Sequence, residues 1–493
     1  MARAHVDVTR REDGTIRIDA GAVAGSAAQD GAVAGSAAQD GAVAGSAAQD
    51  GAFAGSAIHD DEPAGYAAHN DEPAGYAVHD DEFAGGPDLT RAVLDVAGAV
   101  LTWPVLGVPG PPSAEVHDRG RAQQWLWALY GERVATAVHD RTAAEPDGVR
   151  VAVDPTDLAG SAARLALGHW AARWWPASYQ DGIPALEPDV LGLELAALTH
   201  RCQQLFDGEG DQPDDCTAEL IEEHRDALDP LVQWWRAAPQ SADTARHLES
   251  VLRLIDHAAD TLGLDGPALR HLRSSLGRRR PAGVPLDPGS LFARDGGGYA
   301  LAAGEQLVAG GRVIARGSGT NDWRRYPPGL VDAAEDAVSW TARALGARRR
   351  IEVEVVAHTA APSAGASLVA EAHVNGGRPN RVPLTRTDDR WTGRADLDPG
   401  LLGGTEPPHI EVGVLLPGFD PGPFERGFFD PGSGSDPVPG EDRGRVARDA
   451  IRALARRRLN AAERLTYDTS PYDVSWGPFL AETVAAGPTG EDY

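Results

Sequence analysis

The chain contains no lysine, because all 45 of its basic residues are arginine. A P-loop needs a lysine at the β- and γ-phosphates, a protein kinase needs its strand lysine, and Schiff-base enzymes need a lysine amine. Arginine cannot take over the last of these roles, because its guanidinium group does not lose its proton in proteins. We therefore expect none of these three chemistries.

Cysteine is almost as scarce, with two in 493 residues. So few thiols exclude a disulfide framework and suit a reducing cytoplasm. The opening residues, MARAHVDVTRREDG, lack the apolar stretch of a secretory signal. The most apolar run, residues 89–108, contains Arg91, Asp95 and Pro104, whereas a membrane span needs about 20 residues nearly free of charge. We expect a cytoplasmic protein, and we expect 89–108 to form a buried helix followed by a turn.

The two cysteines lie near two histidines, in the order His200, Cys202, Cys216 and His224. In a helix, residues two apart point about 200° apart, and residues eight apart are separated by about 12 Å along the axis. Zinc binds its ligands at about 2.0–2.3 Å, so one ion cannot reach all four side chains. We expect buried free thiols here, and neither a metal nor a cofactor.

The charge balance is strongly acidic, with a formal net charge of −28. A surface of this sign repels nucleic acid and anionic lipid. We therefore expect neither nucleic acid nor a membrane as a partner.

Residues 1–86 are dominated by a tandem repeat. The decapeptide GAVAGSAAQD occupies 21–30, 31–40 and 41–50, and degenerate copies continue to residue 86. The first copies offer only valine and alanine for burial, while two glycines per copy lose much entropy on ordering. The composition predicts a disordered N-terminal arm that acts as a spacer.

Residues 87–280 show helical periodicity and carry eight of the 12 tryptophans. Ala163, Leu167, Trp170 and Trp174 fall on one helical face, and similar stripes follow, which favours a helical bundle. Tryptophans at such positions more often fill a core than line a pocket. If they do line a pocket, the first ligand-binding candidates are His169, Trp170, Trp174 and Glu194.

In residues 290–416 the apolar side chains recur at every second position, as they do in β-strands. The run IEVEVV at 351–356 alternates apolar and acidic side chains, as a strand with one buried face does. The run 338–343, VSWTAR, fits a strand or a helix, and the strand is slightly favoured. Further short strands predict an antiparallel β-sandwich. The pattern resembles immunoglobulin- and C2-type modules at the level of fold, which implies no function.

The C-terminal part begins with a Pro/Gly-rich linker at 417–443, followed by an amphipathic helix at 444–466 and a tail at 467–493. Ile451, Leu454 and Leu465 belong to the apolar face of the helix, and Arg452 and Arg456 lie on the other side. We expect the helix to dock on an acidic surface, of this chain or of a partner, through its apolar face. Its arginines would then pair with carboxylates at the rim.

Catalytic signatures are missing from the sequence. It contains no HExxH, no GxSxG and no GxGxxG motif. None of the chemistries that these motifs serve is therefore indicated.

Taken together, the periodicities predict a multidomain α plus β protein, with a helical bundle followed by an antiparallel β-sandwich. The first functional hypothesis is a non-enzymatic interaction or adaptor protein with a protein partner. The alternative is an enzyme or small-molecule-binding protein with a pocket in the helical domain.

Overall fold

The protein is represented by a computed structural model that describes 14 stretches of the chain. These are residues 4–20, 89–107, 110–141, 148–154, 156–206, 213–237, 241–278, 286–292, 311–358, 361, 367–397, 408–419, 439–465 and 477–487. The decapeptide repeats lie outside the described residues, so the disorder expected for them stays a prediction.

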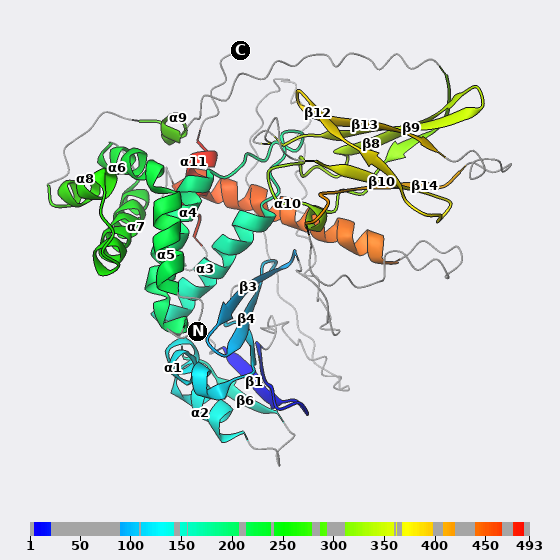
Figure 1. Cartoon of the computed structure of the whole chain (residues 1–493). Helices are drawn as coiled ribbons and strands as arrows, with labels where there is room; N and C mark the ends of the chain where they lie inside the picture. The colour runs from blue at the N-terminus through cyan, green and yellow to red at the C-terminus, as the bar shows by residue number, and fades with distance from the viewer. Residues whose placement is uncertain are drawn as a thin grey trace, which may run out of the picture. The chain divides into compact units, whose positions relative to one another are not determined.

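The first six strands of the chain form one antiparallel sheet (Figure 1). Its strands are β1 (His5–Arg10), β2 (Ile16–Ala20), β3 (Arg91–Val96), β4 (Ala99–Pro104), β5 (Ser113–Val116) and β6 (Val149–Ala152). Their order across the sheet is β3-β4-β5-β2-β1-β6. Four apolar side chains of β1 and β2 are fully buried, namely Val6, Val8, Ile16 and Ile18.

This sheet corrects two expectations from the sequence. Residues 5–20 form two strands near the centre of the sheet and are not part of a disordered arm. Residues 91–104 form the β3–β4 hairpin instead of a buried helix. The physical reason is visible in β3, where Ala92, Leu94 and Val96 are buried and alternate with exposed residues. That alternation has the period of a strand with one covered face.

The repeats are therefore an insertion between β2 and β3 of one sheet. Ala20, at the end of β2, donates its backbone N–H to Ser113 Oγ at 3.3 Å. Ser113 pairs with Thr102 of β4, and nearby Pro104 pairs with Arg91 at the start of β3. Both ends of the insertion consequently lie at the same end of the sheet, three strand spacings or roughly 15 Å apart.

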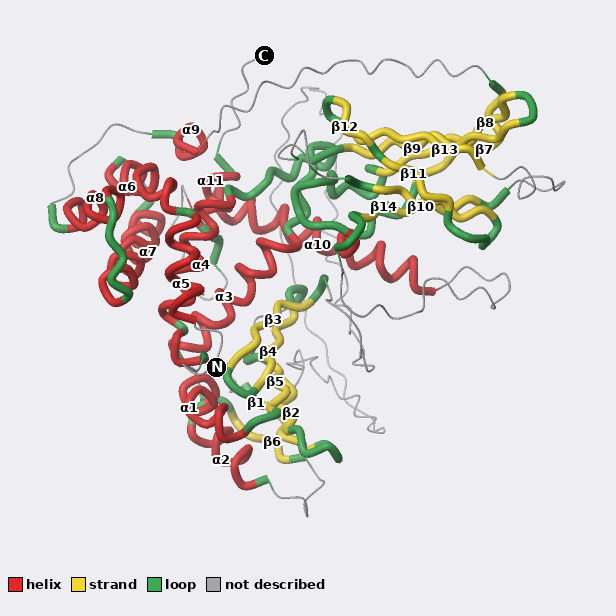
Figure 2. Tube along the Cα trace, viewed as in Figure 1, coloured by secondary structure: helices red, strands yellow, loops and turns green. Residues whose placement is uncertain are grey.

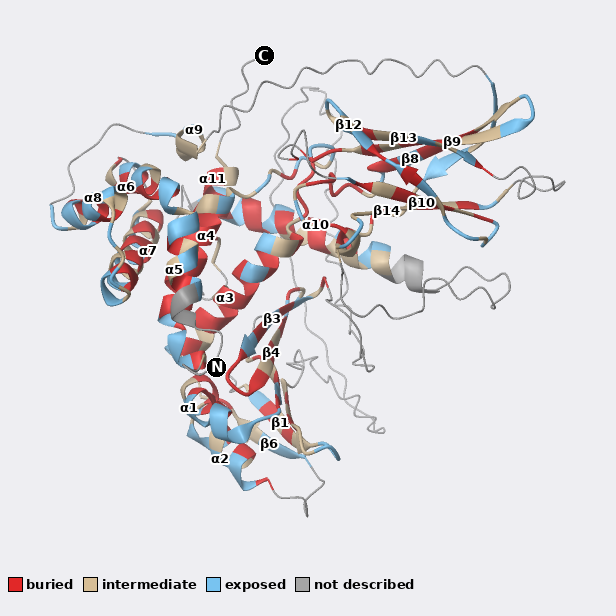
Figure 3. Cartoon of the chain, viewed as in Figure 1, coloured by how far each residue is buried: buried red, intermediate tan, exposed pale blue. Residues whose placement is uncertain are grey.

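Helices follow the first five strands (Figure 2). They are α1 (Arg119–Tyr130), α2 (Glu132–Asp140), α3 (Asp157–Trp174), α4 (Pro188–Arg201), α5 (Pro213–Glu223), α6 (Leu228–Arg236), α7 (Ala242–Thr261), α8 (Pro267–Leu276) and α9 (Pro288–Phe292). Helix α3 packs on β3 and on α4, and α4 also contacts α5 and α7. Figure 3 shows that α3 and α4 are buried along much of their length.

Most of the tryptophans in this region belong to the core. Trp125 and Trp170 are buried, and their indole N–H groups donate to the carbonyls of Ala97 and Leu89, each at 2.7 Å. Trp127 is different, because it lies on α1 with 61% of its surface exposed. The inward-facing indole groups of Trp125 and Trp170 are thus satisfied by main-chain oxygen atoms.

Two further antiparallel sheets occupy residues 312–415. The five-stranded sheet has the order β12-β13-β9-β8-β7, and the three-stranded sheet has the order β11-β10-β14. Their strands are β7 (Arg312–Ser318), β8 (Val338–Leu345), β9 (Arg348–Val356), β10 (Val369–Val374), β11 (Asn380–Pro383), β12 (Thr385–Thr387), β13 (Arg390–Leu397) and β14 (Ile410–Leu415). The strands expected at 351–356 and 338–343 are present as parts of β9 and β8.

The chain is thus a mixed α and β protein with antiparallel sheets, as the sequence predicts at the coarse level. The expected order, a bundle followed by a sandwich, does not describe it fully, because the six-stranded sheet includes four strands that lie within residues 87–280.

Two helices end the described chain. Helix α10 spans Pro439–Leu465, and α11 spans Leu480–Ala485 within the segment expected to be a tail. Among the described residues, no helix is long and apolar enough to cross a membrane.

Candidate functional site: the arginine face of helix α10

The four residues proposed from the sequence for a pocket have different surroundings. His169 is exposed, whereas Trp170 is buried and bonded to the carbonyl of Leu89. Trp174 is buried, with the guanidinium of Arg173 4.0 Å from its ring centroid. Glu194 is buried among charged partners. These different surroundings give no support to a shared pocket, and the ligand-binding role of the four residues stays a prediction.

The buried side of α10 carries arginine as well as apolar residues. Its buried positions follow helical spacing and are Arg448, Ile451, Arg452, Ala455, Arg458, Leu459 and Ala462. Arg452 is only 4% exposed, so it lies beneath the helix and not at the rim where the sequence analysis put it. Buried charges are costly unless they are paired, so the partners of these arginines determine how α10 is held.

The other docking candidates of α10 are placed as follows. Ile451 is fully buried, and Leu454 is half-buried against the core. Arg456 keeps 46% of its side chain exposed. The side chain of Leu465 lies outside the described residues.

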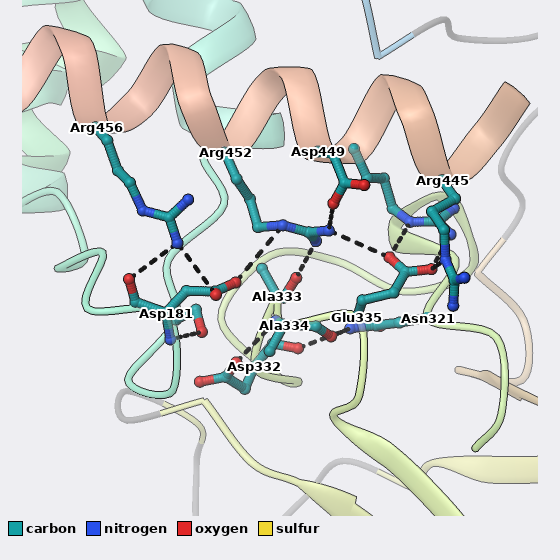
Figure 4. A network of polar contacts seen from close by, with 12 residues as sticks. Asp181, Asn321, Asp332, Ala333, Ala334, Glu335, Arg445, Asp449, Arg452 and Arg456 are labelled. Atoms are coloured by element: carbon teal, nitrogen blue, oxygen red, sulfur yellow. Dashed lines mark hydrogen bonds and ion pairs between the residues drawn. The ribbon is translucent and has the colours of Figure 1, made fainter. Parts of the chain in front are cut away.

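Glu335 is the main partner of the amino-terminal half of α10 (Figure 4). Arg448 binds both of its carboxylate oxygens, with Nε at 2.9 Å and Nη2 at 2.5 Å. Arg452 Nη2 lies 3.5 Å from the same carboxylate, and Arg445 Nε lies 3.6 Å from it. Burial alone would raise the pKa of Glu335, but the hydrogen bond from Arg448 and the charges of the three arginines lower it. The carboxylate is therefore held in its charged form.

Arg452 and Arg456 join this cluster to a second loop. Arg452 donates from Nη1 to the carbonyl of Ala333 at 3.0 Å, and its Nε lies 3.5 Å from Asp181. It also contacts Asp449, one turn earlier in α10. Arg456 Nη2 lies 3.1 Å from the Asp181 carboxylate and donates to its main-chain oxygen at 3.1 Å. We call Arg448, Arg452, Arg456, Asp181 and Glu335 the arginine junction.

The loops on either side of the junction are also bonded to each other. Asp332 accepts from the backbone N–H of Ala334 and of Tyr179, each at 2.8 Å. The N–H of Ala333 donates to the carbonyl of Ala177 at 3.1 Å. Because Asp181 follows α3 and Glu335 precedes β8, the junction ties the helical region to the sheets of residues 312–415.

A second charged cluster surrounds Glu194 of α4. Its Oε1 accepts from Arg164 Nη2 at 2.6 Å and lies 2.8 Å from His247 Nε2. Its Oε2 accepts from the backbone N–H of Leu480 at 2.8 Å. Burial would raise the pKa of Glu194, but the charges and hydrogen bonds of His247 and Arg164 outweigh it and lower the pKa to about 2. Sequence reasoning selected Glu194 but missed its partners, which come from α3, α7 and α11.

Glu194 should therefore make folding sensitive to acid. Its folded-state pKa of about 2 lies below the ordinary glutamate pKa of 4.5, so its contribution to stability is present above about pH 4.5 and is lost as the pH falls toward 2. We expect Glu194→Gln to lower the free energy of unfolding at pH 7 and to flatten its pH dependence between these values. Urea unfolding of both proteins across this range measures the effect, and parallel curves would contradict the assignment.

The cysteines and histidines considered for zinc have separate surroundings. Cys202 is buried, and burial raises the pKa of its thiol to about 12. Cys216 is exposed, which corrects the expectation that both thiols are buried. His224 Nδ1 lies 3.0 Å from Asp189, while the ring of His200 lies 5.1 Å from that of His257. No group of three or more His, Cys, Asp or Glu side chains that could hold a metal occurs in the part of the chain that the structure describes.

Comparisons with protein-family models, with curated proteins and with solved structures found no match. Glu335 and Asp181 were not selected from the sequence, because neither stands in a motif and each lies more than 100 residues from its arginine partners.

Proposed function

We propose that the protein is a non-enzymatic interaction or adaptor protein that acts in the cytoplasm and binds a protein partner. The observation that carries the proposal is the arginine junction. Its buried guanidinium groups, those of Arg448 and Arg452, are paired with Glu335, Asp181 and the carbonyl of Ala333, so they serve to join two parts of the chain.

In this proposal the helices between residues 119 and 276 act as a bundle, and the two sheets between 312 and 415 act as a β-sandwich. Helix α10 keeps the two in a defined arrangement through Asp181 and Glu335. A fixed arrangement lowers the entropic cost of binding a partner that contacts both parts. Neither nucleic acid nor a membrane is expected as a partner, because the net charge is −28.

The alternative, an enzyme or small-molecule-binding protein, is less well supported. It relied on His169, Trp170, Trp174 and Glu194 converging on one pocket. Trp170 and Glu194 instead make hydrogen bonds within the protein's interior.

The proposal is tested by isolating the full chain under native conditions and identifying what remains bound to it. We expect a protein partner in a fixed ratio, and the purified partner should bind again with a Kd in the micromolar range or below. Native mass spectrometry of the same sample detects a small ligand. A stoichiometric small ligand that is lost in Glu194→Gln, without any bound protein, would instead support the alternative.

A further inference from the structure

The C-terminal residues Gly477–Gly487, which we call the C-terminal peptide, lie in a groove of the helical region. Helix α11 of this peptide contacts α4, α7, α9 and α10. Phe479 is fully buried, with the guanidinium of Arg164 4.8 Å and that of Arg458 5.4 Å from its ring centroid. A Cβ added to Gly168 of α3 would come within 3.4 Å of the Phe479 ring, so the helix backbone passes close to the phenyl group. The groove therefore has a specific place for an aromatic side chain.

Polar contacts fix the peptide's main chain at the same point. Arg164 donates to the carbonyls of Gly477 at 3.0 Å and Pro478 at 2.8 Å. Glu194 accepts the backbone N–H of Leu480 at 2.8 Å. Main-chain contacts of this kind hold a peptide whatever its side chains are, whereas the pocket for the ring selects among sequences.

Charge adds a second requirement on the sequence of the peptide. Arg458 of α10 forms a two-pronged ion pair with Glu482, at 2.5 and 2.8 Å, and Glu482 is fully buried. Among the described side chains that contact the peptide, two guanidinium groups, those of Arg164 and Arg458, would face one carboxylate, that of Glu194, if the peptide were absent. The groove would then carry an excess positive charge, which a carboxylate three residues after the aromatic ring neutralises.

The peptide's order depends on the groove. Helix α11 has only six residues, and isolated helices of that length are unstable in water. Residues 466–476 connect the peptide to α10 and lie outside the described residues. Beside Pro478 lies a hollow of about 210 Å³, which is lined by Leu454, Arg457, Arg458 and Ala461.

We propose that this groove is a peptide-binding site, that the chain's own C-terminal peptide is its resident ligand, and that a protein partner binds by displacing it. The partner's segment carries a phenylalanine followed three residues later by a glutamate. This inference rests on the proposed interaction function and names the partner's chemistry. The tethered peptide competes at an effective concentration in the millimolar range, so it restrains partners of moderate affinity.

The test uses the full chain with a specific protease site introduced at residues 468–473. After cleavage, a labelled synthetic peptide of residues 476–487 is added in excess. We expect it to replace the cleaved fragment and to bind the uncleaved chain at least about 100-fold more weakly, because the tethered peptide competes there. If the fragment stays bound against a large excess until the protein unfolds, the segment is a permanent part of the core and the proposal fails.

Variant peptides test the two sequence requirements. We expect Phe479→Ala to weaken binding by at least about 100-fold, since the ring is fully buried. The matched control, Phe479→Leu, keeps an apolar side chain and should lose less. Glu482→Gln should lose at least about 10-fold through the unpaired Arg458. Equal binding of the unaltered peptide and its three variants would overturn the proposal.

The partner distinguishes this inference from the proposed function. If an excess of the peptide of residues 476–487 releases a captured partner, the result supports both the adaptor function and the groove as the partner's binding site. A partner that this peptide does not release retains the adaptor function and refutes the groove as its site. Exchange of the peptide without any captured partner supports the groove and removes the support for the adaptor function.

Discussion

Removal of residues 1–20 should unfold the six-stranded sheet, whereas removal of the repeats at 31–80 should leave the protein at least as stable as before. The first deletion takes away β1 and β2, whose side chains Val6, Val8, Ile16 and Ile18 are fully buried. Each is worth about 1.5–3 kcal/mol, or about 6–12 kcal/mol together. That sum matches the whole free energy of unfolding of an ordinary protein, about 5–15 kcal/mol.

The second deletion shortens only the connection from β2 to β3. It removes whole repeats, and the remaining residues can still span the roughly 15 Å between the two strand ends. If the connection behaves as an unstructured loop, as its composition predicts, shortening it about fourfold lowers the entropic cost of closing it by about 1 kcal/mol. Calorimetry of the two deletion variants measures the difference. A fall of more than about 5 °C in the unfolding temperature without residues 31–80 would show that the repeats pack on the body.

The sequence predicted the second half of the fold better than the first. Strand β9 was recognisable because its apolar and acidic side chains alternate, and the register with β8 and β13 buries the apolar set. The β3–β4 hairpin was missed because its turn, Ala97–Gly98, carries no asparagine or aspartate. Gly98 has φ +73°, and a Cβ there would come within 2.4 Å of the Asp118 carbonyl. This requirement for glycine comes from a tertiary contact that the sequence does not display.

The candidate site was predictable only in part for a similar reason. Periodicity indicated an amphipathic helix near residues 444–465, and Ile451 lies on its buried side. The same reasoning put Arg452 outside, because arginine is ordinarily exposed. Its burial depends on Asp181 and Ala333, which tertiary structure brings to α10 from distant parts of the sequence.

The arginine junction provides a matched pair of substitutions on one helix, with the same residue type one turn apart. We expect Arg452→Ala to lower the free energy of unfolding by about 1.5–3 kcal/mol, because it removes a buried guanidinium group that donates to the carbonyl of Ala333 and pairs with Asp181 and Glu335. Arg456→Ala should cost less than about 1 kcal/mol, since Arg456 is 46% exposed and surface ion pairs contribute little.

Hydrogen exchange across residues 444–465 locates the effect. In Arg452→Ala the amides of α10 should exchange much faster, as they should in Ile451→Asp, which puts a charge at a fully buried position. In Arg456→Ala they should exchange as in the unaltered protein. If Arg452→Ala behaves like Arg456→Ala while Ile451→Asp still releases the helix, apolar contacts alone hold α10. Added salt further distinguishes the contacts of the two arginines, because it screens the exposed Arg456–Asp181 ion pair far more than the buried contacts of Arg452.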